Sequence, residues 1–220
     1  MEQCEENKLT EHESDNMVDF QTLTKKQKEM GKDPRLNTDM KFNLHHLLFS
    51  LFLMIKPKRA DMGDVYVSRD GLIPESYFKK NFIHLKSGDA VSVLYMKKYK
   101  NSNERGLIKE ELDEEMALII KRSFVAFPRD HLFVHTRGKD KSATRTMRHP
   151  YDKNDSYGKF VRRAFETHFG KTQGVTLWRR VYVTECVDFN SKTYKELKDD
   201  AHKSGQSVAT QLLVYKFCKP

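Results

Sequence analysis

The chain has 220 residues, a length that accommodates one domain with an appended arm. Lys and Arg total 40 against 31 Asp and Glu, and the formal charge of +9 favours nucleic acid or an anionic membrane surface as partner, although a basic protein without such a partner has the same composition. The longest apolar run, residues 44–55, is too short to cross a bilayer, and three scattered cysteines without a CxxC pair exclude a disulfide framework and a zinc site.

The N-terminal part of the chain predicts a helical arm. Residues 1–20 are acidic and polar and contain no secretory signal, so we expect an intracellular protein. Thr10 and Glu13 have the spacing of a capping box, which predicts a short helix. The charge of residues 24–39, with a glycine and a proline, predicts a linker, and apolar residues at helical spacing over 44–55 predict a buried helix.

The middle of the chain changes to the period of strands. Residues 81–85, 90–98 and 106–112 read as three short strands, of which the last two form a hairpin. A helix over 110–127 and a strand-like segment at 131–136 follow. The remaining elements are a long cationic loop at 137–156, helices at 157–170, 176–189 and 191–203, and a closing helix that carries Tyr215.

These elements predict an α+β fold that is mostly helical, a helical bundle with a small three-stranded antiparallel sheet on one side. Residues 1–40 form the arm and linker, and residues 41–220 form the main domain.

Tyr215 is the first candidate for chemistry. A phenol is a poor nucleophile at neutral pH unless cations stabilise its anion or its target. A phosphodiester target would call for arginines, which bind phosphate oxygens bidentately, and for an acid that protonates the leaving oxygen. Arg59, Lys100 and Arg179 precede Tyr215 at the end of the buried helix, in the hairpin and in an amphipathic helix.

The motifs around these residues carry a family resemblance. The segments "LFLMIKPKRADMGDVYV", "YKNS", "LWRRVYVTE" and "AHKSGQSVATQLLVYKF" occur in that order. Together they resemble the catalytic domain of tyrosine recombinases (integrases), whose outline type IB topoisomerases share, and within it the divergent recombinases of large DNA viruses, virophages and crypton-like elements. The resemblance covers roughly residues 40–217 and implies the mostly helical catalytic-domain fold of that family, with residues 1–40 as a remnant of its core-binding domain.

The resemblance also implies a function and a set of roles. The activity would be site-specific cleavage and rejoining of double-stranded DNA through a 3′-phosphotyrosyl intermediate, by an oligomer on DNA in the nucleus or a viral factory. Tyr215 would be the nucleophile, Arg59 and Arg179 the phosphate-binding arginines and Lys100 the general acid. Gln206 would occupy the family's histidine position, nine residues before Tyr215. No metal or cofactor is expected, since the chain has neither a P-loop nor a metal-ligand cluster.

Several residues depart from the family pattern or compete for a role. Gln206 donates hydrogen bonds but cannot shuttle a proton, and Thr176 stands where many members have His or Lys. Either departure would slow cleavage. Lys56 and Lys58 compete with Arg59, and Lys97 and Lys98 with Lys100. The chain looks like a catalytic domain that is truncated or lacks a partner domain.

Most arginines lie between residues 121 and 180, which favours a nucleic-acid surface there. The expected DNA contacts are Arg137, Lys139, Lys141, Arg145, Arg148 and Arg180, although the loop that holds most of them reads equally as a solvated loop.

Two other classes of function remain open. One is a catalytically impaired DNA-binding descendant of a recombinase. The other is an unrelated basic module, in which Arg59, Arg179 and Tyr215 would lie far apart and Tyr215 would only fill a core.

Overall fold

The structure is a computed structural model that describes residues 8–58, 60–68, 75, 79–86, 91–99, 102–136, 150–151 and 156–217. The described part is a mostly helical α+β fold with one sheet, as the sequence predicts. The helices are α1 (Glu11–Asn16), α2 (Phe20–Met30), α3 (Met40–Met54), α4 (Ser102–Arg105), α5 (Glu114–Ala126), α6 (Ser156–Phe169), α7 (Val175–Cys186), α8 (Tyr194–Lys203) and α9 (Val208–Thr210). The strands are β1 (Val65–Ser68), β2 (Asn81–His84), β3 (Val93–Met96) and β4 (Ile108–Glu111).

The sheet has four strands in the order β1-β2-β3-β4. The three predicted strands are confirmed as β2, β3 and β4, and both of their pairings are antiparallel. The prediction of a purely antiparallel three-stranded sheet is wrong, because β1 adds a fourth strand parallel to β2, with Val65 opposite Asn81. A parallel neighbour needs a long crossover and leaves no hairpin signal in the sequence.

The strand-like segment at 131–136 contributes backbone bonds to β1 rather than a strand of its own. The nitrogen of Val67 donates to the Asp130 oxygen at 2.9 Å, and the nitrogen of Leu132 donates to the Val65 oxygen at 2.7 Å. In the segment itself only isolated bridges occur, Tyr66 with His131 and Val134 with Pro150. These bonds cover the outer edge of β1, where unpaired backbone groups would otherwise face solvent.

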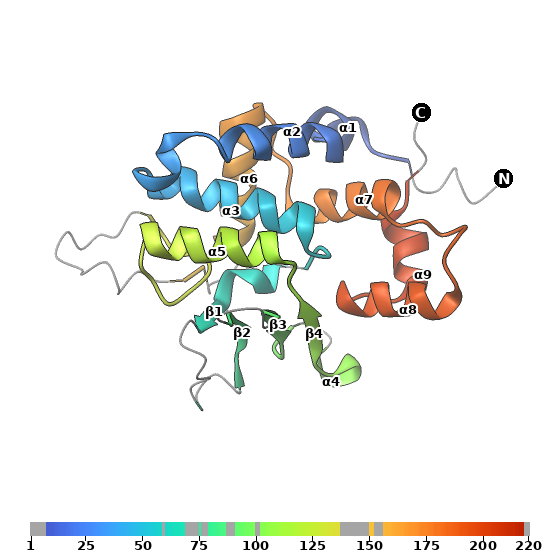
Figure 1. Ribbon diagram of the computed structural model, residues 1–220. Coiled ribbons are helices and arrows are strands. Elements are labelled where there is room, and N and C mark those ends of the chain that lie inside the picture. The colour runs from blue at the N-terminus through green and yellow to red at the C-terminus, as the bar shows by residue number, and fades with distance from the viewer. Residues whose placement is uncertain are drawn as a thin grey trace.

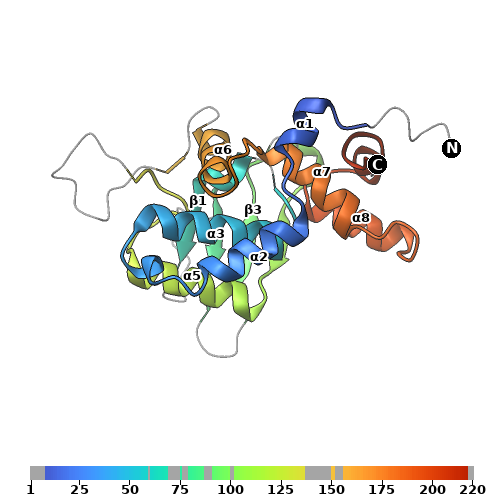
Figure 2. The same cartoon turned by 90° about the horizontal axis from the view of Figure 1, so that it is seen from above.

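Helix α3 is the central element of the helical layer. Every residue from 42 to 52 is buried, as expected for a helix that is apolar on nearly all sides. Figure 1 shows α2 and α5 on either side of it and the sheet below, and Figure 2 shows α3 and α5 crossing over the strands. The hydrophobic core therefore lies between α3, its neighbouring helices and the sheet.

Helix α2 replaces much of the linker predicted for residues 24–39. Asp19 caps the helix by accepting from the Thr22 nitrogen at 2.7 Å, and Leu23, Gln27 and Met30 form its buried face. The lysines between those positions dominate the local composition. The sequence therefore did not reveal the buried face of this helix. A 3-10 turn at Pro34–Asn37 then leads into α3.

Trp178 connects the arm to the main domain. Its ring is fully buried and stacks between Phe52 of α3, with ring centroids 5.4 Å apart, and Phe20 of α2, at 6.0 Å. Trp178 is therefore part of the hydrophobic core. This stack fixes the start of α7, and with it the next residue, Arg179, relative to α2 and α3.

The closing helix predicted around Tyr215 is present as a short segment whose last turn is π-helical. Helix α8 ends at Lys203, and a turn leads to the short α9, which continues as a π-helical turn at Gln211–Tyr215. The π-type bond runs from the Lys216 nitrogen to the Gln211 oxygen at 2.8 Å. Turns of this kind are rare, occur mostly inside α-helices, and are frequent at functional sites.

Candidate functional site

The structure describes four of the predicted site residues. Arg179, Arg180, Gln206 and Tyr215 lie within the described ranges. The predicted residues that lie outside them are Arg59, Lys100, Arg137, Lys139, Lys141, Arg145 and Arg148.

Arg179 and Tyr215 lie against each other, although they are distant in the sequence. Arg179 is 2% exposed and comes from α7, and Tyr215 is 7% exposed and comes from the π turn, which packs against α7. The Arg179 guanidinium carbon lies 4.7 Å from the centroid of the Tyr215 ring. A guanidinium at this distance makes a cation–π contact with the ring.

Gln206 joins this pair through Arg179. The amide orientation that satisfies both groups turns the Gln206 oxygen toward Arg179, where it accepts from Nη2 and, at 2.6 Å, from Nε. Gln206 is 2% exposed, so this contact is screened from water. Because the oxygen is bound to Arg179, the NH₂ group is the part of the amide that is able to donate to a phosphate.

An open pocket of about 780 Å³ lies in front of Arg179 and Tyr215. Thr176, the residue that departs from the family pattern, lines it in the first turn of α7, and Arg162 of α6 lines it from the side. Gly174 caps α7 without a side-chain hydrogen bond. The first-turn N–H groups and the dipole of α7 therefore favour an anion in this pocket, as do the charges of Arg162 and Arg179.

Arg180 is engaged by the acidic arm. Its Nη1 donates to both carboxylate oxygens of Glu13 at 2.8 Å, and its side chain is 12% exposed. Burial alone would raise the pKa of Glu13, but hydrogen bonds from Thr10 and Arg180 hold it below its ordinary value. Glu13 also lines the pocket in front of Tyr215. Arg180 would have to exchange this carboxylate for a phosphate in order to contact DNA.

Two further cations lie near this site: Lys58, which the sequence offered only as a competitor of Arg59, and Arg105, which it did not single out. Lys58 has a side chain that is 4% exposed and donates to the Glu110 carboxylate and to the Lys203 carbonyl. Arg105 of α4 donates through Nη1 to the Gln206 carbonyl. Burial lowers the pKa of Lys58, against the pull of Glu110, and Lys56 and Arg179 lower it further. In a chain with 40 Lys and Arg, no local pattern separates these two from solvated cations.

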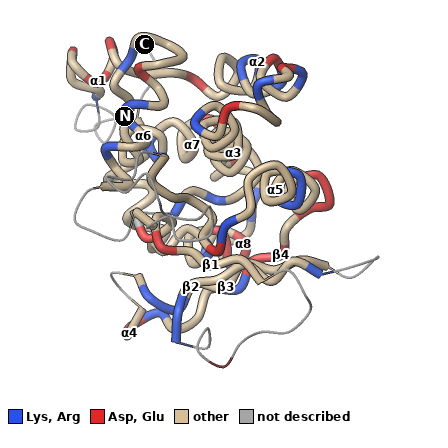
Figure 3. Tube along the Cα trace, turned by 90° about the vertical axis from the view of Figure 1, so that its left-hand side faces the viewer, with Lys and Arg blue, Asp and Glu red and all other residues tan. Residues whose placement is uncertain are grey.

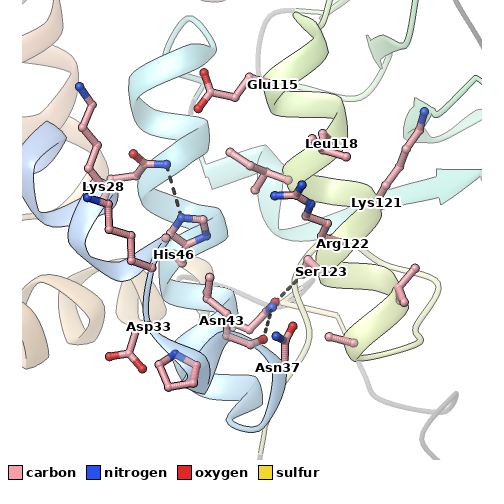
Figure 4. A pocket seen from close by; sticks show the side chains of 18 residues that line it. Lys28, Asp33, Asn37, Asn43, His46, Glu115, Leu118, Lys121, Arg122 and Ser123 are labelled. Atoms are coloured by element: carbon pink, nitrogen blue, oxygen red, sulfur yellow. Dashed lines mark hydrogen bonds between the residues drawn. The ribbon is translucent and has the colours of Figure 1, made fainter.

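A second cavity of about 1010 Å³ lies between α2, α3 and α5 (Figure 4). Its polar floor is bonded internally: the Ser123 hydroxyl donates to Asn43, and the Gln27 amide nitrogen donates to Ser50 at 3.0 Å and lies 3.4 Å from His46 Nε2. None of the described site residues predicted from the sequence lines it. We interpret this cavity as part of the packing contact between α2 on one side and α3 and α5 on the other.

Three further features of the described residues bear on function: the charge on the helices, groups of possible metal ligands, and the length of apolar helices. Helices α2 and α5 each carry Lys or Arg together with Asp or Glu (Figure 3). Over these ranges, no three His, Cys, Asp or Glu side chains are grouped as metal ligands would be. No helix within them has the length and apolarity to traverse a bilayer.

Comparison with known proteins gave no match to a family model, a curated protein or a solved structure. The candidate site is therefore defined by Arg179 and Tyr215 at the pocket and by Gln206, which contacts Arg179.

Proposed function

We propose that the protein is a DNA strand transferase of the tyrosine recombinase type, with Tyr215 as nucleophile. One observation carries the proposal: Arg179 lies against Tyr215 and is held by Gln206, at the wall of a pocket of about 780 Å³. A phosphoryl-transfer site requires an arginine beside the nucleophile, and this contact meets that requirement.

The contacts support a division of roles. The Tyr215 oxygen would form a bond to phosphorus as the bond from phosphorus to the 5′-oxygen breaks, and the 5′-hydroxyl would later reverse the step. The phosphodiester bond energy is retained in the protein–DNA link, so no energy source is required. Arg179, the Gln206 NH₂ group and the first turn of α7 would stabilise the negative charge of the pentacoordinate phosphate. The resemblance assigns the second arginine to Arg59 and the general acid to Lys100.

The partner in this proposal is double-stranded DNA, bound by an oligomer of the chain at the DNA of the host nucleus or viral factory. The net charge of +9 supports a polyanionic partner. The cationic side chains expected to contact phosphates lie at Arg137, Lys139, Lys141, Arg145, Arg148 and Arg180.

A catalytically impaired DNA-binding protein is the second candidate, and a different observation favours it. Arg179 is 2% exposed, and its Nη2 donates at 3.2 Å to the Ser204 carbonyl as well as to Gln206. A guanidinium committed to internal acceptors has less to offer a phosphate. Tyr215 is also mostly buried, so its oxygen has to gain access to the pocket before it attacks.

A nicked duplex distinguishes the two candidates. Attack beside the nick releases a short 5′-hydroxyl fragment, which diffuses away and leaves a covalent complex that resists SDS. We expect this complex without added metal in the wild type and its loss in Tyr215→Phe. Tyr182→Phe is the matched control, because Tyr182 packs in the same cluster as Tyr215. Absence of the complex in the wild type, together with salt-sensitive DNA binding, would instead establish the DNA-binding candidate.

A further inference from the structure

The C-terminal end of α8 forms a complete Schellman motif. The Gln206 nitrogen donates to the Ala201 oxygen at 2.8 Å, and the Gly205 nitrogen donates to the His202 oxygen at 2.8 Å. Gly205 has a φ of +66°, the left-handed conformation that such a motif requires. These two bonds satisfy the carbonyls of Ala201 and His202, and the carbonyls of Lys203 and Ser204 remain for partners from elsewhere in the fold.

Cations from two other segments take these remaining carbonyls. Lys58 donates to the Lys203 oxygen, and Arg179 Nη2 donates to the Ser204 oxygen at 3.2 Å. Arg105 donates to the backbone oxygen of Gln206, which is the last residue of the turn. Positive groups at a helix C-terminus are stabilised by the helix dipole as well as by the hydrogen bonds. The turn at 203–206 thus lies among three cations, and one of them is the arginine that lies against Tyr215.

Lys58 connects this turn to the sheet. Its ammonium group also donates to Glu110 of β4, and both side chains are largely buried, at 4% and 10% exposure. The contacts therefore run from β4 through Lys58 to the end of α8, and from there through Ser204 and Gln206 to Arg179. A charged pair that is buried in this way is costly to break, so its geometry is well determined.

We propose that Lys58 is a positioning residue: by holding the C-terminal turn of α8 against β4, it fixes Arg179 and Gln206 in place beside Tyr215. This inference rests on the proposed function for its catalytic consequence, but not for its structural one. Among the described residues, Lys58 is bonded to Glu110 and to the Lys203 carbonyl, and neither bond reaches Tyr215 directly.

The first test measures the geometry without any reaction. Hydrogen exchange of the Arg179 Nε–H, assigned by its loss in Arg179→Lys, reports whether Gln206 still accepts from it. Lys58→Met alone would leave Glu110 buried without a partner, so the variant is Lys58→Met with Glu110→Gln. We expect exchange to accelerate at least about tenfold in this variant.

Lys56→Met is the matched control for that test. Lys56 comes from the same segment and bonds to Asp200 of α8, but Asp200 also holds Lys192 at 2.5 Å and lies before the turn. Exchange of the Arg179 Nε–H should therefore stay within about twofold of the wild type. Unchanged exchange in the folded Lys58/Glu110 variant would overturn the proposal.

The second test measures the reaction. In single-turnover cleavage of the nicked duplex, the Lys58/Glu110 variant should lose at least about tenfold in rate while its DNA affinity stays within about twofold. Gly205→Ala should do the same, whereas Gly170→Ala, with a comparable φ of +67° and no atom near its added methyl group, should not.

The two tests fail in different ways. If the wild type forms no covalent complex, the proposed function fails, and the exchange experiment still decides whether Lys58 positions Arg179. If cleavage occurs and the Lys58/Glu110 variant keeps the wild-type rate, the positioning role is refuted and the proposed function stands.

Discussion

The buried histidine His46 predicts a specific loss of stability in acid. His46 lies on α3, is 7% exposed, and burial lowers its pKa to about 4 from an ordinary value of 6.5. Between these two values the unfolded chain binds the proton and the folded chain does not. The free energy of unfolding therefore falls as the pH decreases through 6.5 toward 4.

The size of this loss follows from the two pKa values. For one such histidine, linkage gives a decrease of about 2 kcal/mol in the free energy of unfolding between about pH 7.5 and about pH 5. His45 and His168, whose pKa values burial lowers to about 3 and about 4, add losses of the same sign. The contribution of His46 is therefore measured as a difference between the wild type and a variant.

His46→Gln is the variant, since an amide is able to keep the contact with Gln27 without titrating. Urea unfolding at the two pH values should show a loss about 2 kcal/mol smaller in His46→Gln than in the wild type. His12→Gln is the control, because His12 is exposed on α1, and it should lose as much as the wild type. An equal loss in His46→Gln and the wild type would refute the burial of a neutral His46.

The remaining predictions concern the arm and the start of α3. Glu13→Gln removes the carboxylate that holds Arg180, so DNA affinity should rise about fivefold near physiological salt and the salt slope should steepen by about 0.9, as filter binding or anisotropy would measure. Glu11→Gln makes the same change of charge on α1 and should have a much smaller effect; an equal gain would contradict the role of the pair. Asp39→Ala removes the cap that accepts from the Lys41 and Phe42 nitrogens at 2.8 and 3.1 Å and should cost about 1 kcal/mol in chemical denaturation. Asp39→Ser, which keeps a capping oxygen, should retain most of that stability, and equal losses in both variants would count against the cap.

Much of the fold was predictable because its signals are local. Three of the four strands and helices α3, α5, α6, α7 and α8 lie where the apolar pattern of the sequence predicts them, and α3, α5 and α8 also have side-chain caps. Short-range sterics and the burial of one face determine such elements. The same holds for the order of Arg179, Gln206 and Tyr215, which the sequence displays directly.

The tertiary structure decided the features that depend on distant partners. Strand β1 forms because β2 and residues 130–132 offer it hydrogen bonds, and neither lies next to it in the chain. The π turn at Gln211–Tyr215 is likewise an irregularity within the closing helix that the local pattern did not predict. Propensity is a weak guide where tertiary hydrogen bonds compensate for an irregular backbone.

The assignment of individual cations was also decided by the tertiary structure. The sequence offered Lys58 only as a competitor of Arg59 and Arg180 as a DNA contact, but the structure buries Lys58 against Glu110 and pairs Arg180 with Glu13. The sequence determined which side chains were available for chemistry, because residue type and order are local properties. Only the folded structure determined which of them lie together in low dielectric, because desolvation and pairing depend on the whole surroundings of a charge.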